Sequence, residues 1–318
     1  MAEEEAQAHQ LKALPVKSVA RLQAAPAIPL TATLASGASI PLIGLGTWKS
    51  KPGQVRDAIV YAVTKAGYRH IDAAAIYENE GEVGAALSEV FSKWDVSRSD
   101  VWVTTKIWND AHAAAKVEPA AVKSMRLLGV DYLDALLIHW PVTAGNRGDA
   151  LAPSTKETWQ ALEALVDKGL VRHLGVSNFS VKKMQEIMAY ARHPLSISQC
   201  ESHPFFRNDG PGGVVDFCEQ NNIHFTAFSP LGSPDSADIF RRDAPVLMED
   251  ATVKAIAERT GKNAGQVRAQ RAGVVQEGGA GHTGIRAVYS VLAVVHGGRG
   301  GTTSCRARPR DEPTAGGL

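Results

Sequence analysis

Four side chains that can handle a proton lie at or just beyond the ends of three extended apolar stretches. Asp72 ends YRHID, Tyr77 follows it by five residues, Lys106 lies near the end of VWVTTKIW, and His139 follows LLI. An amine beside a phenol stabilises the phenolate and lowers the phenol pKa, and a neighbouring carboxylate keeps that amine charged. An imidazole can orient a carbonyl oxygen or share its proton. Such a set makes a phenol usable as a general acid near neutral pH, which the reduction of a carbonyl group requires.

Each of these residues also has a purely structural interpretation. An Asp after a strand is usually a turn former or a helix cap, and a lone Tyr is usually half-buried in a core. A Lys at a strand end is usually a solvated charge, and a His between apolar residues and a Trp is more often structural. The functional interpretation therefore depends on a fold that brings all four residues to one place.

The elements that would position these residues alternate along the chain between helical and extended patterns. Such alternation indicates βαβ units and a parallel sheet. A hairpin is expected first, around Ser36 and Gly37, because two short extended pieces flank this turn signal. The expected strands are 42–47, 68–72, 100–108, 132–140, 171–179, 196–202 and 223–233. The expected helices are 55–67, 80–94, 119–129, 154–169 (with Ser154 as its cap), 180–192, 213–222 and 249–261.

Two α/β architectures fit this order, a doubly wound sheet and a (β/α)₈ TIM barrel. A doubly wound sheet would gather its site at one switch point, whereas a barrel delivers residues from many strands to one face. Polar residues lie at or near the ends of six different expected strands. This distribution favours the barrel: Asp72, Lys106, His139, Asn178, Gln199 and Ser229.

Four sequence segments resemble the signature segments of the aldo-keto reductases. They are GYRHIDAAAIYENE, VWVTTKIWN, DYLDALLIHWP and GVSNFS, and the resemblance runs from about Leu34 to Lys262. It includes the spacings, with 29 residues from Tyr77 to Lys106 and 33 from there to His139. The resemblance implies an NADPH-dependent reductase on a (β/α)₈ barrel, aldose or aldehyde reductase-like. Tyr77 would be the proton donor, with Lys106 and Asp72 tuning it and His139 positioning the substrate carbonyl.

The same resemblance implies the cofactor NADP(H) and the residues that hold it. A Ser-Asn pair and a Gln hold the nicotinamide carboxamide in the family, and an aromatic residue, usually Tyr, stacks on the ring. Ser177, Asn178, Gln199 and Phe228 match these positions. The remaining matches are Thr47 at the first strand end, Asp72 at the second, Ser229, Leu231 and Ser233 in the loop that lies against the pyrophosphate, and Lys49 and Asp235 in the strap that closes over it.

Three tryptophans match the walls of the substrate pocket of the family. Trp48 directly follows an expected strand, and Trp108 and Trp140 each end one. Plain core packing is the alternative for each, but three at strand ends of one mouth favour a pocket for a small carbonyl substrate.

The end of the chain departs from the family pattern. After Lys262 the sequence contains no Lys, Trp or Phe, and nine of residues 273–301 are Gly. This composition suggests a shifted reading frame or an alternative exon. Residues 287–295 are the only part of this tail rich enough in apolar and β-branched residues to form a strand, and their valines do not alternate cleanly. We therefore expect a barrel that is incomplete or irregular at its eighth strand.

Three regions follow from these patterns. Residues 1–30 are polar and Ala/Pro-rich and predict a mobile extension, 31–266 form the barrel domain, and 267–318 are an atypical Gly/Arg/Ala-rich tail.

Composition excludes several classes of protein. A net charge of +1 and 6% aromatic residues argue against nucleic-acid and membrane partners. No apolar run is long enough to cross a membrane, and the first residues lack the apolar core of a signal peptide. Cys200, Cys218 and Cys305 show neither metal-ligand nor disulfide spacing, which favours a reducing cytosol and no metal. We expect a monomer.

Two functions remain open at this point. The first is an NADP(H)-dependent reductase of aldehydes or ketones. The second is a catalytically impaired or non-functional isoform that serves at most as a binding or regulatory barrel, which the unusual tail favours.

Overall fold

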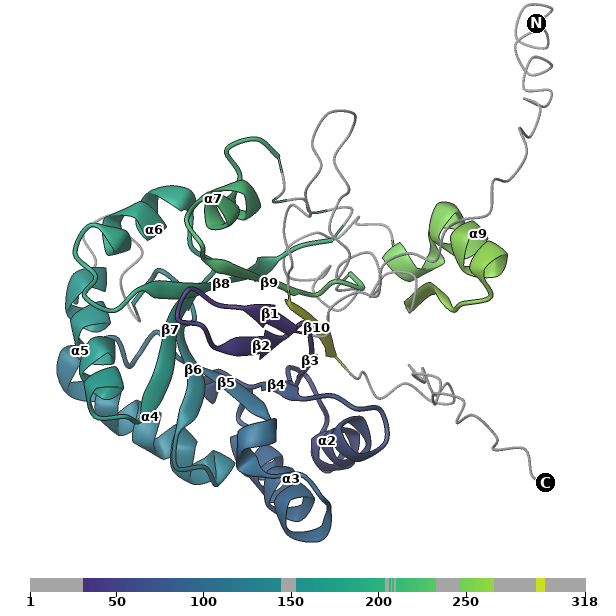
Figure 1. Cartoon of the computed structure of the whole chain (residues 1–318), viewed down its shortest axis with the longest axis horizontal. Helices are drawn as coiled ribbons and strands as arrows, with labels where there is room; N and C mark the ends of the chain where they lie inside the picture. The colour runs from purple at the N-terminus through teal and green to yellow at the C-terminus, as the bar shows by residue number, and fades with distance from the viewer. Residues whose placement is uncertain are drawn as a thin grey trace, which may run out of the picture.

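Eight parallel strands form a closed barrel in the order β10-β3-β4-β5-β6-β7-β8-β9 (Figure 1). The computed structural model describes residues 31–143, 153–203, 206, 208, 210–232, 246–265 and 290–294. Every residue of β5 and of β6 is buried, as expected of parallel strands covered on both faces. The barrel strands are β3 (Ile43–Gly46), β4 (His70–Asp72), β5 (Trp102–Ile107), β6 (Leu133–Ile138), β7 (Val171–Ser177), β8 (Leu195–Glu201), β9 (His224–Phe228) and β10 (Ser290–Val294). The predicted (β/α)₈ architecture is thus confirmed.

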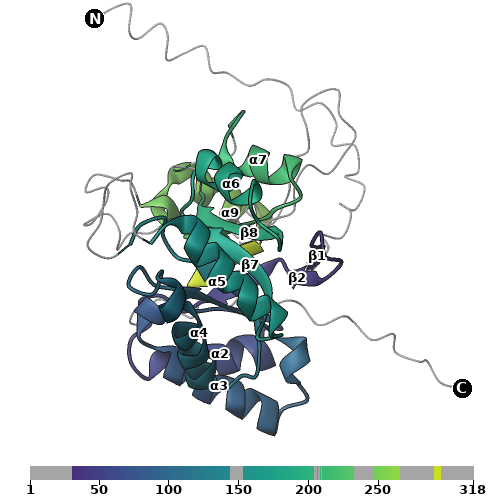
Figure 2. The same cartoon turned by 90° about the vertical axis from the view of Figure 1, so that its left-hand side faces the viewer.

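Helices connect successive strands, and α2 to α7 lie outside the barrel (Figures 1 and 2). The connecting helices are α2 (Gln54–Thr64), α3 (Glu80–Lys93), α4 (Ala114–Leu128), α5 (Thr155–Asp167), α6 (Val181–Met188) and α7 (Val214–Gln220). Helix α9 (Ala251–Thr260) follows β9, and short 3₁₀ turns are η1 (Ala75–Tyr77), η2 (Arg98–Asp100) and η4 (Leu247–Glu249).

The first and last residues of these helices lie within four residues of the expected bounds, except at the start of α4. The predicted cap of α5 is present, because the Ser154 hydroxyl accepts a hydrogen bond from the Glu157 backbone N–H and the Glu157 carboxylate accepts one from the Ser154 N–H. Helix α4 begins at Ala114 rather than at the predicted Pro119. Proline is common at the first position of a helix, which led to the predicted start. The Ala-rich residues before Pro119 are also good helix formers, however, and their extra turn buries Val117.

The eighth strand comes from the tail segment 287–295. β10 pairs with β3 from Val291–Ile43 to Val294–Gly46, but with β9 only at Ser290–Thr226 and Val291–Ala227. The barrel is therefore closed rather than incomplete, and the pairing of β10 with β9 is as short as that of β3 with β4. Residues 1–30 and most of residues 267–318 lie outside the described ranges, so their assignment as an extension and an atypical tail stays a prediction.

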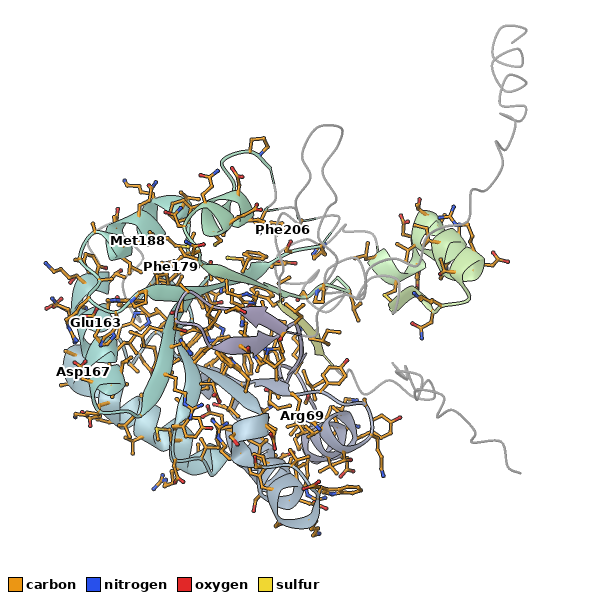
Figure 3. All side chains as sticks on the ribbon, viewed as in Figure 1. Arg69, Glu163, Asp167, Phe179, Met188 and Phe206 are labelled. Atoms are coloured by element: carbon orange, nitrogen blue, oxygen red, sulfur yellow. The ribbon has the colours of Figure 1, made fainter. Side chains whose placement is uncertain are left out.

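The two ends of the barrel differ. The predicted hairpin, β1 (Thr31–Thr33) and β2 (Ser39–Pro41), packs Leu34 and Ile40 against Trp102, at the start of β5, and closes the end where the strands begin. Apolar side chains fill the layer between the strands and the helices, and side chains occupy the space that the strands enclose (Figure 3). The polar residues identified in the sequence lie at the opposite end, where the strands finish.

Candidate active site

The four proton-handling residues meet at the carboxyl end of the barrel. Asp72 is the last residue of β4, Lys106 the penultimate residue of β5, and His139 directly follows β6. These three are buried, and Tyr77, in η1 just after β4, is half-buried. Because β4, β5 and β6 are neighbours in a parallel barrel, their ends bring these residues together.

Lys106 and Asp72 form a buried ion pair. The Lys106 Nζ lies 2.5 Å from the Asp72 Oδ1 and also donates to the Ala73 carbonyl oxygen at 2.9 Å. Their side chains are 0% and 3% exposed. Burial alone lowers the pKa of Lys106, but the charge of Asp72 and the nearby Tyr77 outweigh it, so the pKa lies above its usual value. Lys106 is therefore a fixed ammonium at neutral pH.

Tyr77 lies between this ammonium and His139. The Lys106 Nζ is 5.2 Å from the Tyr77 ring centroid, and the Tyr77 and His139 rings meet edge to face at 5.7 Å. Burial raises the pKa of Tyr77, and this effect exceeds the lowering by the charge of Lys106. The sequence-based expectation of a lowered phenol pKa is therefore wrong in its net direction, because it weighed the neighbouring charge and not the desolvation. The phenol stays protonated at neutral pH, as a proton donor requires.

His139 is a neutral imidazole in this environment. Burial lowers its pKa to about 2, and the charge of Lys106 adds to this effect. Its Nδ1 is buried and has no hydrogen-bond partner among the residues that the structure describes. The ring packs edge to face against Trp108 at 5.2 Å. A neutral ring held in this way can bind a polar group without adding a charge to the mouth.

Three amide and hydroxyl side chains lie at the ends of the next two strands. The Gln199 Nε2 donates to the second oxygen of Asp72 at 2.8 Å. The Asn178 Nδ2 donates to the His139 carbonyl oxygen at 3.0 Å and contacts the Ser177 Oγ at 3.1 Å. Asn178 has a φ of 65°, a left-handed conformation that Asn adopts more readily than most residues. The residues matched to carboxamide binding are thus joined to the proton-handling group by hydrogen bonds.

Sequence reasoning missed two residues that hold this end together. The Asn79 Nδ2 donates to the Thr47 carbonyl oxygen at 2.8 Å, and the Glu80 carboxylate is buried beside β5. Thr47, which was predicted beneath the cofactor, is buried and donates from its hydroxyl to the Asp72 carbonyl oxygen at 3.0 Å. The signal that could have identified both is a polar pair, Asn79-Glu80, directly after the candidate proton donor.

Aromatic residues surround Tyr77 and His139 at the mouth. Trp48 lies 6.5 Å from the Tyr77 ring, centroid to centroid, and Trp108 contacts His139 as described above. Trp140 is half-buried directly after His139. The structure therefore brings two of the three predicted pocket tryptophans into ring contact with the proton-handling residues.

The remaining predicted cofactor residues are placed in part. Phe228 ends β9 and is half-buried, Ser229 follows it with a φ of 50°, and Leu231 is half-buried two residues later. Lys49 lies over the Trp48 ring, with its Nζ 4.7 Å from the centroid. The predictions for Ser233 and Asp235 fall outside the described residues.

The nicotinamide end of a dinucleotide fits the donors and acceptors at this rim. Ser177 and Gln199 are 1% and 2% exposed, and together with Asn178 they offer a hydroxyl and two amides without a net charge. Such a set complements a neutral carboxamide, and Phe228 supplies an aromatic face on the neighbouring strand.

Comparisons with known proteins agree with this geometry. The chain matches the aldo/keto reductase family over residues 42–269. An aldo/keto reductase of Synechocystis sp. is 44% identical over 245 residues, which are 74% of each chain. Aldo-keto reductase family 1 member A1 of Homo sapiens is 44% identical over 248 residues, again 74% of each chain. A solved aldose reductase from Schistosoma japonicum shares 30% identity, with 83% of this chain and 82% of that one covered and a TM-score of 0.67.

Proposed function

Because the chain belongs to the aldo/keto reductase family, and is thereby a carbonyl-reducing oxidoreductase, we propose that it reduces small aldehydes or ketones to alcohols with NADPH. Tyr77 is the proton donor in this proposal. The observation that carries it is the buried Lys106–Asp72 pair beside the Tyr77 ring. A structural ion pair needs no phenol next to it, whereas a phenol that gives up its proton needs a fixed cation.

Each of the four residues has one task in the proposed reaction. The Tyr77 hydroxyl donates its proton to the carbonyl oxygen of the substrate, and the phenolate that remains is stabilised by the ammonium of Lys106. Asp72 keeps that ammonium in place and charged. His139, being neutral, donates one hydrogen bond that orients the carbonyl oxygen toward Tyr77. Tyr77 then recovers a proton from solvent.

The cofactor would be held at the ends of β7, β8 and β9. Ser177, Asn178 and Gln199 would bind the carboxamide, and Phe228 would pack against the ring. When bound, NADPH supplies the hydride that the carbonyl carbon accepts. The cofactor residues Thr47, Lys49, Ser229 and Leu231 and the pocket residues Trp48, Trp108 and Trp140 complete the proposal.

The alternative, a barrel without turnover, rests on one observation. The family match ends at residue 269, close to the point where the composition of the tail changes. In family members this part of the chain grips the 2′-phosphate of the cofactor. Activity measurements on the whole chain separate the two functions.

The deciding experiment mixes purified protein with NADPH and a reactive small aldehyde and follows the nicotinamide absorbance. We expect oxidation of NADPH that depends on both protein and aldehyde and that the variant Tyr77→Phe lacks. Parallel titrations with NADPH and NADH measure which dinucleotide binds. A folded protein, as judged by circular dichroism, that neither binds NADPH nor consumes it with a panel of aldehydes and ketones would instead support the alternative.

Compartment and assembly complete the proposal. Among the residues that the structure describes, no helix has the length and apolar character needed to span a membrane, and Cys200 and Cys218 are buried free thiols. We propose a cytosolic monomer that acts on a small carbonyl substrate without nucleic-acid or membrane partners.

A further inference from the structure

Glu80 is a buried carboxylate next to the proton-handling group but not part of it. Glu80 is 3% exposed, and both of its carboxylate oxygens accept hydrogen bonds from hydroxyl groups. The Thr105 Oγ1 donates to Oε1 at 2.6 Å, and the Ser124 Oγ donates to Oε2 at 2.9 Å. Glu80 begins α3, while Thr105 belongs to β5 and Ser124 to α4. One carboxylate thus joins three elements.

One of these elements, β5, carries the proposed cation, and another, α3, begins just after the proposed proton donor. Tyr77 lies three residues before Glu80, and Thr105 directly precedes Lys106. Successive residues of a strand point to opposite faces, so Lys106 faces the barrel interior while Thr105 faces the helices. The Glu80–Thr105 hydrogen bond lies on the outer, helix-facing side of β5. It therefore links the segment of Tyr77 to the strand of Lys106, whose Nζ lies 5.2 Å from the Tyr77 ring centroid.

The segment that carries Tyr77 needs such a link. It is a single 3₁₀ turn, and Glu78 follows in a left-handed conformation with a φ of 57°, which is strained for a residue other than glycine. The backbone N–H groups of Tyr77 and Glu78 bond locally, to Ala74 and Ala75. Asn79, bound to the carbonyl oxygen of Thr47 directly after β3, and Glu80, bound to Thr105 of β5, then attach this turn to the barrel.

We propose that Glu80 is a positioning residue, which holds Tyr77 at its working distance from Lys106 through its hydrogen bond to Thr105. This role rests on the proposed reductase function. Glu80 touches neither substrate nor cofactor in this proposal and acts only through the two segments that it joins.

The electrostatic setting agrees with this role. Burial raises the pKa of Glu80, while the two hydroxyls and the charges of Lys106 and Lys123 offset part of the rise. Among the residues that the structure describes, the titratable groups that face Tyr77 are Lys106, Asp72 and His139. The charge of Lys106 lowers the Tyr77 pKa by more than that of Asp72 raises it, so a Tyr77 that moves away from this pair while staying buried has a higher pKa.

Two isosteric or near-isosteric variants test the proposal because each removes one hydroxyl from the same carboxylate. Thr105→Val removes the hydrogen bond to the strand of Lys106, and Ser124→Ala removes the one to α4. We expect Thr105→Val to lower kcat about tenfold or more with KM changed less than about twofold, since a small misplacement of a reacting group is costly. We also expect the alkaline limit of the pH–kcat profile to move upward. Ser124→Ala should destabilise the fold but leave kcat and the profile unchanged.

A second comparison covers the case in which Thr105→Val does not fold. In Glu80→Gln the amide oxygen still accepts from Thr105 and its NH₂ group can donate to Ser124, so kcat should stay within about threefold of the parent. Glu80→Ala should show the loss expected of Thr105→Val. Equal effects of Thr105→Val and Ser124→Ala on kcat and pH profile, or no rescue by glutamine, would overturn the positioning role.

The proposed reductase function can fail separately, and this result is recognisable. If the parent chain shows no turnover, the Tyr77 pKa is measured by NMR on protein with ¹³Cζ-labelled tyrosine, with the signal assigned through Tyr77→Phe. A higher Tyr77 pKa in Thr105→Val but not in Ser124→Ala would support the link, whereas identical titrations in both variants would refute it.

Discussion

Replacing Asp72 by asparagine tests how strongly the buried ion pair contributes to stability. Asp72 accepts from the Lys106 Nζ with one oxygen and from the Gln199 Nε2 with the other. Asparagine keeps the shape but has one acceptor oxygen and an NH₂ group, so one of the two donors faces another donor. The Lys106 ammonium, with 0% side-chain exposure, also loses its counter-charge. Breaking a buried pair in this way typically lowers the free energy of unfolding by about 3–5 kcal/mol.

The pH dependence of this loss identifies its cause. In the parent, Asp72 holds the pKa of Lys106 above its usual value against the effect of burial. Without Asp72, burial is expected to take the folded-state pKa below that of the unfolded chain. The unfolded variant then binds more protons than the folded one, so its stability rises with pH. The difference in unfolding free energy between parent and variant should therefore shrink between pH 7 and pH 10.

A surface ion pair provides the matched control. Asp167, at the outer edge of the helix layer (Figure 3), accepts from the Arg192 Nη2 at 2.6 Å and contacts the His193 Nε2 at 2.8 Å. Its side chain is 47% exposed, so water replaces the lost contacts in Asp167→Asn. We expect this variant to differ little from the parent in denaturant unfolding monitored by circular dichroism. An Asp72→Asn variant within about 1 kcal/mol of the parent at pH 7, or a deficit that does not change with pH, would refute the reasoning about Lys106.

Three further predictions concern the proton donor, the cofactor and acid stability. Tyr77→Phe should lower kcat roughly 10²–10⁴-fold while NADPH binding, measured by fluorescence titration, stays close to that of the parent. Asn178→Ala should weaken NADPH binding by about 1–3 kcal/mol; Asn178→Gly, which tolerates the φ of 65° better, should weaken it similarly if the lost amide rather than backbone strain is responsible. Burial lowers the pKa of His70 to about 4 and of His224 to about 3. Below the usual value of 6.5 the unfolded chain therefore binds more protons, and each histidine should cost about 2 kcal/mol of stability between pH 7 and pH 5 in denaturant titrations; His70→Gln should reduce that pH dependence, and equal slopes for parent and variant would contradict it.

The strand ends could be predicted from the sequence because burial and polarity conflict there. Runs such as those of β5 and β6 are apolar enough to be buried on both faces, so a Lys or His at their ends needs a reason to be there. Lys106 and His139 interrupt these runs, and the parallel order of the strands places both at one end of the barrel. Local periodicity and chain order were sufficient for this part of the site.

The links between these residues could not be predicted, because they depend on tertiary distances. Gln199 and Asp72 are 127 positions apart, and the sequence indicates only that each ends a strand. Glu80 lies in the first turn of a helix, where an acidic residue usually faces solvent and favours the helix dipole. That it is instead buried against Thr105 follows from where the first residue of α3 lies relative to β5, which no local pattern encodes.

The direction of the Tyr77 pKa shift could not be predicted from the sequence either, and this shift bears on the mechanism. The sequence identifies the neighbours of the phenol but not how much water they exclude, and the net direction is set by the competition between burial and Lys106. A raised pKa is compatible with a proton donor, because the phenol has to be protonated when the substrate binds. What speeds proton transfer is stabilisation of the phenolate as it forms, and Lys106 supplies this only while it stays charged and close. Asp72 maintains the charge of Lys106, and in our proposal Glu80 maintains its distance from Tyr77. Loss of Asp72 should therefore impair proton transfer by weakening that charge, and loss of Glu80 by increasing that distance.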